Sequence, residues 1–320
     1  MITTFINSFT TTFWAVFQIL LIAIAAGLLM RKNILTQEQL KAISAIGVRI
    51  LLPCMTFSNI IINFKPAEFK LWPILPISAI LMVGTGIIFA LILFWPNINT
   101  KKHLFAPAAL QNAGYLILPI GQFLYPDQFD KFAMYCFLFI LGLSPLLWSM
   151  GKYLVSSAPD EKLTIKSLFT PPFVASIVAI LLVLLRLQRF IPDPILKSTD
   201  LLGSATVPIA TFILGAVLGT ISFSIKSYAL DAAKVLVIKL LLVPIITIGI
   251  LLLTGLNKNF PLLCDLLVLQ SSSSPATGLI LQIKHYGGNE QEIGSILLLS
   301  YLACIITMPF WLAVWKMIAI

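Results

Sequence analysis

Long apolar runs alternate with short polar stretches along the whole chain of 320 residues. A helix needs about 20 predominantly apolar residues to cross the hydrocarbon core of a bilayer. Ten runs approach that length, so the pattern predicts an all-α, polytopic membrane protein with ten transmembrane helices. We expect them near residues 8–30, 38–62, 71–95, 104–125, 131–154, 169–188, 198–221, 232–254, 260–283 and 292–316.

The longest polar connection divides the chain almost in half. We therefore expect a first five-helix repeat at 1–155, a cytoplasmic connection at 156–168 and a second repeat at 169–320. Prolines recur at matching positions of the two halves. Pro53 and Pro208, in the second helices, are 155 residues apart, and Pro119 and Pro275, in the fourth helices, are 156 apart. An odd number of helices in each half places the repeats in opposite orientations. Inverted repeats of this kind are typical of secondary transporters.

Composition supports the membrane assignment. The chain is 59% hydrophobic and 10% charged, whereas soluble domains have about 25% charged residues. The net charge of +9 comes from basic residues in short loops, where they act as topology signals, so no nucleic-acid partner is expected. Four widely separated cysteines and the lack of metal-ligand spacing predict neither a cofactor nor a metal site.

The distribution of basic residues also predicts an orientation. The first eight residues carry no charged side chain, while Arg31 and Lys32 follow the first apolar run. This arrangement indicates a retained first helix that enters from outside. With the N-terminus outside, eleven Lys and Arg side chains fall on the cytoplasmic side and eight on the other. Both termini are then extracytoplasmic, and we place the protein in a bacterial inner membrane.

The fourth and ninth helices carry features that interrupt a helix. Pro119 removes a backbone donor and frees a carbonyl near Tyr115, and Gly114 makes the backbone easy to bend. In the ninth helix, four serines at 271–274 precede Pro275. Each proline lies fifteen residues beyond the expected start of its helix, close to the bilayer midplane. Helix packing through small residues is the alternative explanation.

These residues make the sequence resemble the auxin efflux carrier family, in particular its bacterial dicarboxylate-carrier-like members. The resemblance rests on Asn112 and Gly114 before Pro119, on Leu52-Pro53, and on Ser274-Pro275-Ala276 followed by Tyr286-Gly287. It implies that the fourth and ninth helices are broken and cross at their prolines. It also implies a substrate site beside that crossing and an elevator-like motion of one domain against another.

Two broken helices would point the positive ends of their second halves at one place, which suits the carboxylate of a small organic anion. The predicted substrate-binding residues are Asn112, Gly114, Tyr115, Ser273, Ser274, Thr277 and Arg49, and the predicted helix-crossing residues are Pro119, Pro275, Pro53 and Pro208. Arg49 and Lys239 are basic residues inside apolar runs. We expect Lys239 to extend toward the nearby cytoplasmic surface and to take no part in the site.

The coupling ion stays open between Na⁺, H⁺ and none. The acidic side chain nearest to the middle of a predicted helix is Asp265, about one turn into the ninth, so a carboxylate proton relay has no carrier. His103 and His285 lie at cytoplasmic helix ends. Hydroxyls and carbonyls around the serine run could hold sodium.

Three other functions are alternatives to secondary transport of an organic anion. A sodium-coupled carrier of the bile-acid-symporter type has a related layout, and a membrane sensor would bind without flux. An intramembrane enzyme is disfavoured because the chain has no HExxH motif, no GxSG serine with a histidine partner and no mid-membrane aspartate pair. The expected partners are the lipid bilayer and a small organic anion, and a homodimeric assembly stays open.

Overall fold

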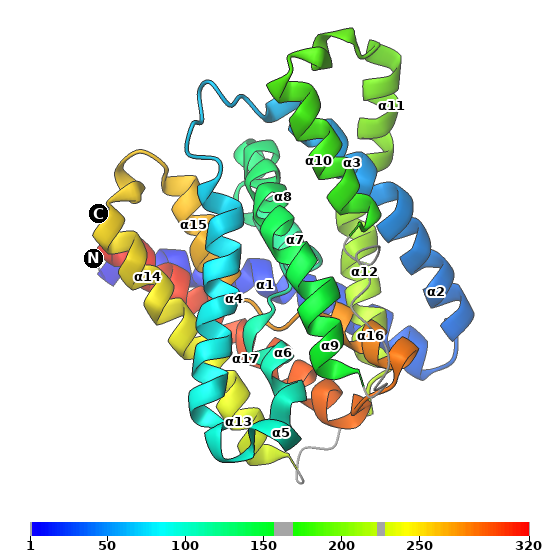
Figure 1. The fold of residues 1–320 in the computed structure, drawn as a ribbon, viewed down its shortest axis with the longest axis vertical. Coiled ribbons are helices and arrows are strands. Elements are labelled where there is room, and N and C mark those ends of the chain that lie inside the picture. The colour runs from blue at the N-terminus through cyan, green and yellow to red at the C-terminus, as the bar shows by residue number, and fades with distance from the viewer. Residues whose placement is uncertain (1, 157–168, 223–227, 320) are drawn as a thin grey trace.

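The computed structural model describes residues 2–156, 169–222 and 228–319. The regular structure in these ranges is helical, apart from one isolated β-bridge (Figure 1). Seven helical segments there are long and apolar enough to span a bilayer. They are α1 (Ile2–Arg31), α2–α3 (Gln37–Asn63), α4 (Ile74–Leu93), α8–α9 with the turn before them (Pro126–Val155), α11–α12 (Asp193–Gly219), α13–α14 (Ala229–Thr254) and α17 (Glu290–Ile318). The predicted all-α, multi-pass architecture is confirmed.

The other three expected spans are short or interrupted. The sixth is α10 (Pro171–Leu184), which has 14 residues and ends earlier than predicted because Arg186 adopts a left-handed backbone conformation. The fourth is divided into α5 (Ile98–Lys101), α6 (Phe105–Ala109) and α7 (Ile117–Leu124). The ninth is divided into α15 (Pro261–Ser271) and α16 (Gly278–Tyr286).

Several helix starts also differ from the prediction. The fourth span becomes helical at Ile98 instead of 104, and the seventh begins at Asp193 instead of 198. Proline in the first turn of α11 starts that helix, since its missing N–H costs nothing there. The first turns of both helices are polar, so a search for apolar runs does not detect them. The predicted connection at 156–168 lies outside the described residues, except for Ser156.

Prolines also shape the long spans. π-helical turns at Gly47–Leu51, Leu147–Gly151 and Ile238–Leu242 separate α2 (Gln37–Ile46) from α3 (Leu52–Asn63), α8 (Phe129–Leu146) from α9 (Lys152–Val155), and α13 (Ala229–Val237) from α14 (Val243–Thr254). Each turn lies within two residues of a proline, namely Pro53, Pro145 or Pro244. Pro53 and Pro244 follow their turns, so each lacks the hydrogen bond to a carbonyl inside the turn and its ring crowds that turn, a conflict that a wider turn relieves. Pro145 instead precedes its turn, so this explanation does not apply to it.

Small residues bring α1 and α12 (Thr206–Gly219) into contact along their backbones. Gly215 and Gly219 of α12 face Ala23 and Gly27 of α1, so closely that a Cβ on Gly215 would lie 2.1 Å from the Ala23 carbonyl oxygen. Glycines spaced by four residues are a common device for close helix packing in membranes. This contact joins the first helix of one half to the second helix of the other.

The two termini lie at the same end of the bundle. The rings of Phe5, near the start of α1, and Phe310, in the last third of α17, are 6.2 Å apart. Figure 1 shows the N and C labels next to each other at the left edge of the view. Both termini are therefore on one side, as predicted, while the identity of that side stays a prediction.

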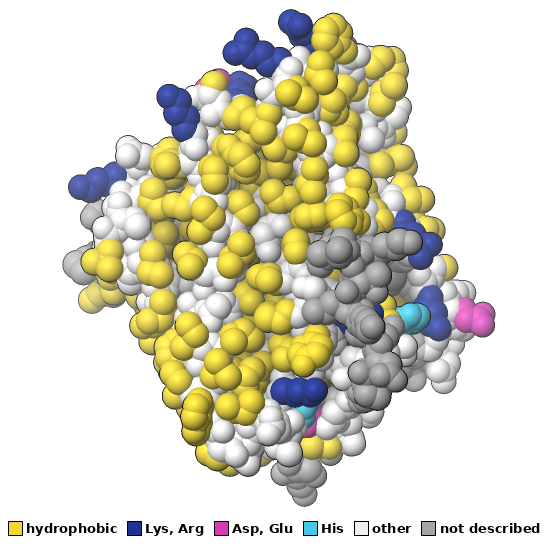
Figure 2. Space-filling view, in the orientation of Figure 1, with side chains coloured by type: hydrophobic (Ala, Val, Ile, Leu, Met, Phe, Trp, Pro, Cys, Tyr) yellow, Lys and Arg dark blue, Asp and Glu magenta, His cyan; other side chains and the backbone are white. Residues whose placement is uncertain are grey.

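The surface agrees with a lipid environment. Hydrophobic side chains cover the broad middle of the face in Figure 2, with Lys and Arg toward its ends and rim. Large apolar side chains such as Ile88 on α4 and Leu253 on α14 are mostly exposed. Exposed apolar area on this scale requires contact with lipid.

Candidate functional site

The two interrupted spans meet at their breaks. Residues 110–116 separate α6 from α7, and residues 272–277 separate α15 from α16. Gln111 and Pro275 form an antiparallel bridge. The Asn112 N–H donates to the Ser274 carbonyl at 2.9 Å, and the Ala276 N–H donates to the Leu110 carbonyl at 3.0 Å. The two stretches therefore pair their own backbone groups in the interior of the bundle (Figure 1), where an unpaired group would be costly.

Local sequence explains both breaks. Pro119 lies in the first turn of α7 and leaves the Tyr115 carbonyl without its helical donor. At the end of α15, the hydroxyls of Ser271, Ser272 and Ser273 donate to backbone carbonyls three or four residues earlier, at 2.8–2.9 Å. Such back-bonding competes with the helical pattern, and Pro275 then prevents its continuation.

The prolines do not lie opposite each other as the sequence suggested. Pro275 lies inside its break and pairs with Gln111, whereas Pro119 is already part of α7. The feature that the two halves share is the length of helix before each break. Helical elements of four, three and five residues follow one another from Ile98 to Ala109 before the first break, and α15, before the second, is similar in length with 11 residues.

Asn112 is at the centre of a polar cluster at the meeting breaks. Its side chain is 4% exposed. The Asn112 Nδ2 donates to the Tyr301 hydroxyl on α17 and, at 3.5 Å, to Thr277 Oγ1. Tyr301 in turn donates to the Pro275 carbonyl at 3.4 Å. The structure thus brings the predicted residues Asn112 and Thr277 together and adds Tyr301, which sequence reasoning missed.

The other predicted residues have different environments. The Ser274 hydroxyl is buried beside Tyr301 and Cys304, but it makes no hydrogen bond of good geometry within the described residues. Ser273 is fully buried and has its donor engaged by the Gln270 carbonyl at 2.9 Å. Gly114 and Tyr115 are half-buried at the end of the first break.

Arg49 and Lys239 have environments opposite to those expected from the sequence. Arg49 lies in the π-helical turn before α3 with an exposed side chain, so it does not share the buried site. Lys239 was expected to reach the surface, yet it is 0% exposed. Its Nζ donates to Gln111 Oε1 at 3.5 Å. That expectation was wrong because the π-helical turn at 238–242, which carries Lys239, packs against α4, α6 and α17.

Two buried glutamines at the breaks were not selected from the sequence: Gln111 lies in the first break, and Gln270 is in the last turn of α15 before the second. Gln111 follows Leu110, and Gln270 follows Leu269, 159 residues later. The Gln111 Nε2 donates to Met82 Sδ at 3.7 Å, and the Gln270 Nε2 donates to Cys136 Sγ at 3.4 Å. The repeated Leu-Gln pair, at nearly the spacing of the prolines, is the signal that could have found them.

Pro53 and Pro208 belong to a different contact. Pro53 is the second residue of α3, directly after a π-helical turn, and Pro208 is the third residue of α12. The helix before α12, α11 (Asp193–Ser204), packs on α3 so closely that a Cβ on Gly203 would lie 2.6 Å from the Met55 Cα. These two prolines are therefore near the packing of the second helices, away from the paired breaks.

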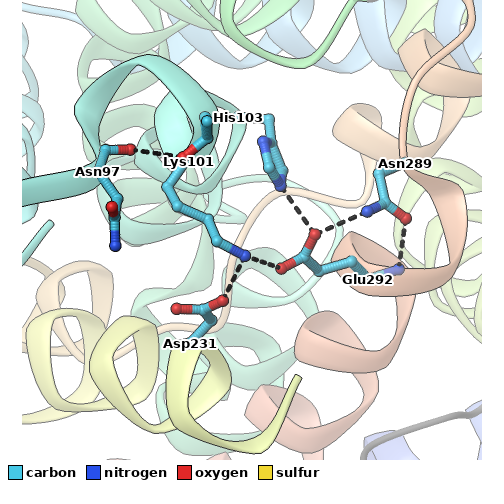
Figure 3. Close-up of polar contacts among 7 residues, drawn as sticks. Asn97, Lys101, His103, Asp231, Asn289 and Glu292 are labelled. Carbon is cyan, nitrogen blue, oxygen red and sulfur yellow. Dashed lines mark hydrogen bonds and ion pairs between the residues drawn. The ribbon is translucent and has the colours of Figure 1, made fainter. Parts of the chain in front are cut away.

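A charged cluster joins α5, the 3-10 turn after it, α13 and α17 (Figure 3). Glu292, buried near the start of α17, accepts from Lys101 at 3.4 Å and pairs with His103 Nε2 at 2.8 Å. Lys101 also pairs with Asp231 on α13 at 2.6 Å. The hydrogen bond to Asp231 raises the pKa of Lys101, and the charge of Glu292 adds to the effect. Asn289 holds Glu292 as well, through Nδ2 at 2.6 Å.

A second carboxylate is buried near the opposite end of α17. Asp265 on α15 is 2% exposed. It accepts from Tyr125 at 3.0 Å and from Trp315 Nε1 at 3.1 Å, and it forms an ion pair with Lys316. Both buried carboxylates are thus neutralised by cations of the chain.

Comparison with known proteins gives a family match over most of the chain. A family model described as "Membrane transport protein" matches residues 11–165 and again 158–312. The same model therefore matches both halves, which supports the internal repeat.

The curated relatives are plant and archaeal proteins. Protein PIN-LIKES 5 of Arabidopsis thaliana is 30% identical over 161 residues, covering 46% of this chain and 40% of its own length. Protein PIN-LIKES 1 of the same plant is 27% identical over 177 residues, covering 51% and 37%. Uncharacterized transporter MJ1031 of Methanocaldococcus jannaschii is 27% identical over 191 residues, covering 57% and 61%. The chain thus spans less than two thirds of the length of each of these relatives.

Proposed function

The chain belongs to the membrane transport protein family, the auxin efflux carrier family, and we propose that it is a secondary transporter of a small organic anion. The substrate site is at the paired breaks between α6 and α7 and between α15 and α16. The observation that carries the proposal is the cluster of Asn112, Thr277 and Tyr301 at that point. The protein is a multi-pass membrane protein, and its archaeal relative is consistent with a place in a prokaryotic inner membrane.

The chemistry of the cluster suits a carboxylate. An asparagine amide and tyrosine or threonine hydroxyls can donate to carboxylate oxygens. The helices α7 and α16 begin where the breaks end, so their N-termini add partial positive charge on that side. In the unliganded protein these polar groups bond one another, and a substrate would replace those bonds with its own.

The transport cycle in this proposal is elevator-like, as the family resemblance implies. The paired backbones give the site a framework in which both halves hold the substrate together. Because the two breaks are hydrogen-bonded to each other, they move as one unit. The substrate site can therefore be exposed to one side of the membrane and then to the other while its residues stay together. Substrate identity, direction and the coupling ion are to be determined experimentally.

Uptake by reconstituted vesicles tests the proposal. Purified protein in liposomes is offered a panel of radiolabelled acids, namely malonate, succinate, citrate and indole-3-acetate, with sodium, pH and membrane potential varied independently. We expect uptake of at least one acid above protein-free vesicles, and counterflow when unlabelled acid is preloaded. Binding without counterflow would identify a sensor, and a strict sodium requirement would favour the bile-acid-symporter type of mechanism.

Two substitutions test the location of the site. Asn112→Ala and Ser274→Ala each remove a buried polar group, and we expect a loss of about 1–3 kcal/mol in substrate binding, roughly ten- to a hundredfold. The matched controls are Asn59→Ala on α3 and Ser176→Ala on α10, both buried and away from the breaks. Wild-type affinity in both test variants would move the site elsewhere and leave the paired breaks as scaffold.

A further inference from the structure

Lys239 is a cation enclosed in the middle of an apolar span. It lies in the π-helical turn Ile238–Leu242 of the 26-residue segment Ala229–Thr254. Its side chain is 0% exposed. Lys234, five residues earlier, is half-buried and lies over the ring of Phe94 at 5.0 Å. The two lysines of this segment therefore differ: Lys234 retains some exposure, and Lys239 has none.

The π-helical turn that carries Lys239 is stabilised by a contact with α17. Pro244 has no N–H with which to bond the Leu240 carbonyl four residues earlier. The indole Nε1 of Trp311 on α17 donates to that carbonyl instead, at 2.7 Å. The π-helical turn is thus fixed by a side chain of a neighbouring helix.

The charge of Lys239 is not neutralised by a carboxylate of the described chain. Its hydrogen bond to Gln111 Oε1, at 3.5 Å, is long and goes to a neutral amide. The buried carboxylates Asp265 and Glu292 are each paired with other cations. A buried charge without a counter-ion lowers stability, and in membrane proteins such residues usually serve function.

The position of the ammonium group connects it to the proposed site. Gln111, its acceptor, is bridged to Pro275 and directly precedes Asn112. The π-helical turn that carries Lys239 packs against α6, which leads into the first break, and against α17, which carries Tyr301. Lys239 therefore borders the same paired breaks from the side of α13 and α14.

We propose that Lys239 supplies the positive charge that the substrate carboxylate neutralises, and so makes the site selective for anions over uncharged analogues. This inference rests on the proposed function. In the dry interior an ammonium group attracts an anion strongly even without direct contact, because screening there is weak. Binding would then relieve the unpaired charge of the empty protein.

The test compares three variants in vesicles and in detergent. Lys239→Met removes the charge and retains an apolar chain, Lys239→Gln keeps a donor for Gln111 without the charge, and Lys234→Met is the control in the same segment. The ligands are the panel acid that wild-type vesicles accumulate and its uncharged amide. Measurements are the KM of uptake and the melting temperature with and without ligand.

We expect both Lys239 variants to raise the KM for the acid at least tenfold and to lose its stabilising effect on melting. Their affinity for the amide should equal that of wild type, and Lys239→Met without ligand should melt no lower than wild type. Lys234→Met should keep the KM within about twofold. A wild-type KM in Lys239→Gln would overturn the inference, and so would melting of unliganded Lys239→Met several degrees below wild type, which would indicate a structural role. If wild-type vesicles accumulate no panel acid, the proposed function itself fails, a result that needs no variant.

Discussion

Alanine in place of Gly215 should destabilise the protein, because α12 has no room for a methyl group where it meets α1. A Cβ at this position would lie 2.1, 2.3 and 2.5 Å from the carbonyl oxygen, Cα and carbonyl carbon of Ala23. All three atoms belong to the backbone, so no side-chain rotation can relieve the overlap. The two helices would have to separate, and the contact of Gly219 with Gly27 would open with them.

Two opposing effects determine how much Gly215→Ala changes the stability of the protein. Alanine inside a helix is normally more stable than glycine by about 0.5–1 kcal/mol. Overpacking a tight interior costs about 1–3 kcal/mol, and rigid backbone neighbours place this site at the upper end. The net expectation is a loss of about 1–2 kcal/mol, or a fall in melting temperature of several degrees at roughly 2–4 °C per kcal/mol.

Gly249→Ala is the matched control. Gly249 lies in α14, and a Cβ there would have no neighbour within 4 Å. It experiences the helix-propensity gain without the clash, so it should melt at or above the wild-type temperature. Thermal unfolding of detergent-solubilised protein, followed by intrinsic fluorescence, measures both variants. If Gly215→Ala melts as high as Gly249→Ala, the close approach of α1 and α12 does not exist as described.

Three further substitutions address the polar interior. Tyr301→Phe removes the acceptor of Asn112, and we expect substrate KM to rise about tenfold, a loss of about 1.4 kcal/mol; an unchanged KM would remove Tyr301 from the site. Glu292→Gln leaves Lys101 with Asp231 alone, and because Lys101 is 29% exposed we expect a loss of about 1–2 kcal/mol in thermal unfolding, below the usual value for a buried pair. Asp265→Asn should lose about 1 kcal/mol of stability, since Lys316 is 35% exposed, but keep most uptake activity. Complete loss of uptake in folded Asp265→Asn would show that transport requires this carboxylate.

Much of the architecture follows from the sequence because the bilayer limits the choices. An apolar run has to be helical when no water can satisfy its backbone, so the long helices were predictable in type and approximate position. The break at 272–277 was predictable as well. Serines that bond their own helix, followed by Pro275, contradict a continuous helix in a way that is local to the sequence.

The details of the site depend on contacts that the sequence does not record. The sequence places Lys239 near a helix end, whereas the side chain is buried because its π-helical turn packs against α4, α6 and α17. Trp311, more than seventy residues away, bonds the Leu240 carbonyl of the same turn. Tyr301 reaches the breaks only because α17 packs beside α15 and α16. Arg49 also lies inside an apolar run of the sequence, but its side chain is exposed in the structure.

Lys239 and Met82 occupy corresponding positions of the two halves, and only the lysine of this pair carries a charge. Lys239 lies 157 residues after Met82, close to the spacing of the repeated prolines, and both belong to the third span of their half. Gln111 contacts both: its Nε2 donates to Met82 Sδ, and its Oε1 accepts from Lys239. A lysine at both positions would place two unneutralised cations beside one amide, where each would repel the other in a medium that screens charge weakly. Methionine at both would leave the carboxylate of the proposed substrate without a counter-charge at the breaks, at a high desolvation cost. One lysine and one methionine give a single positive charge, which is the arrangement that one carboxylate group can neutralise.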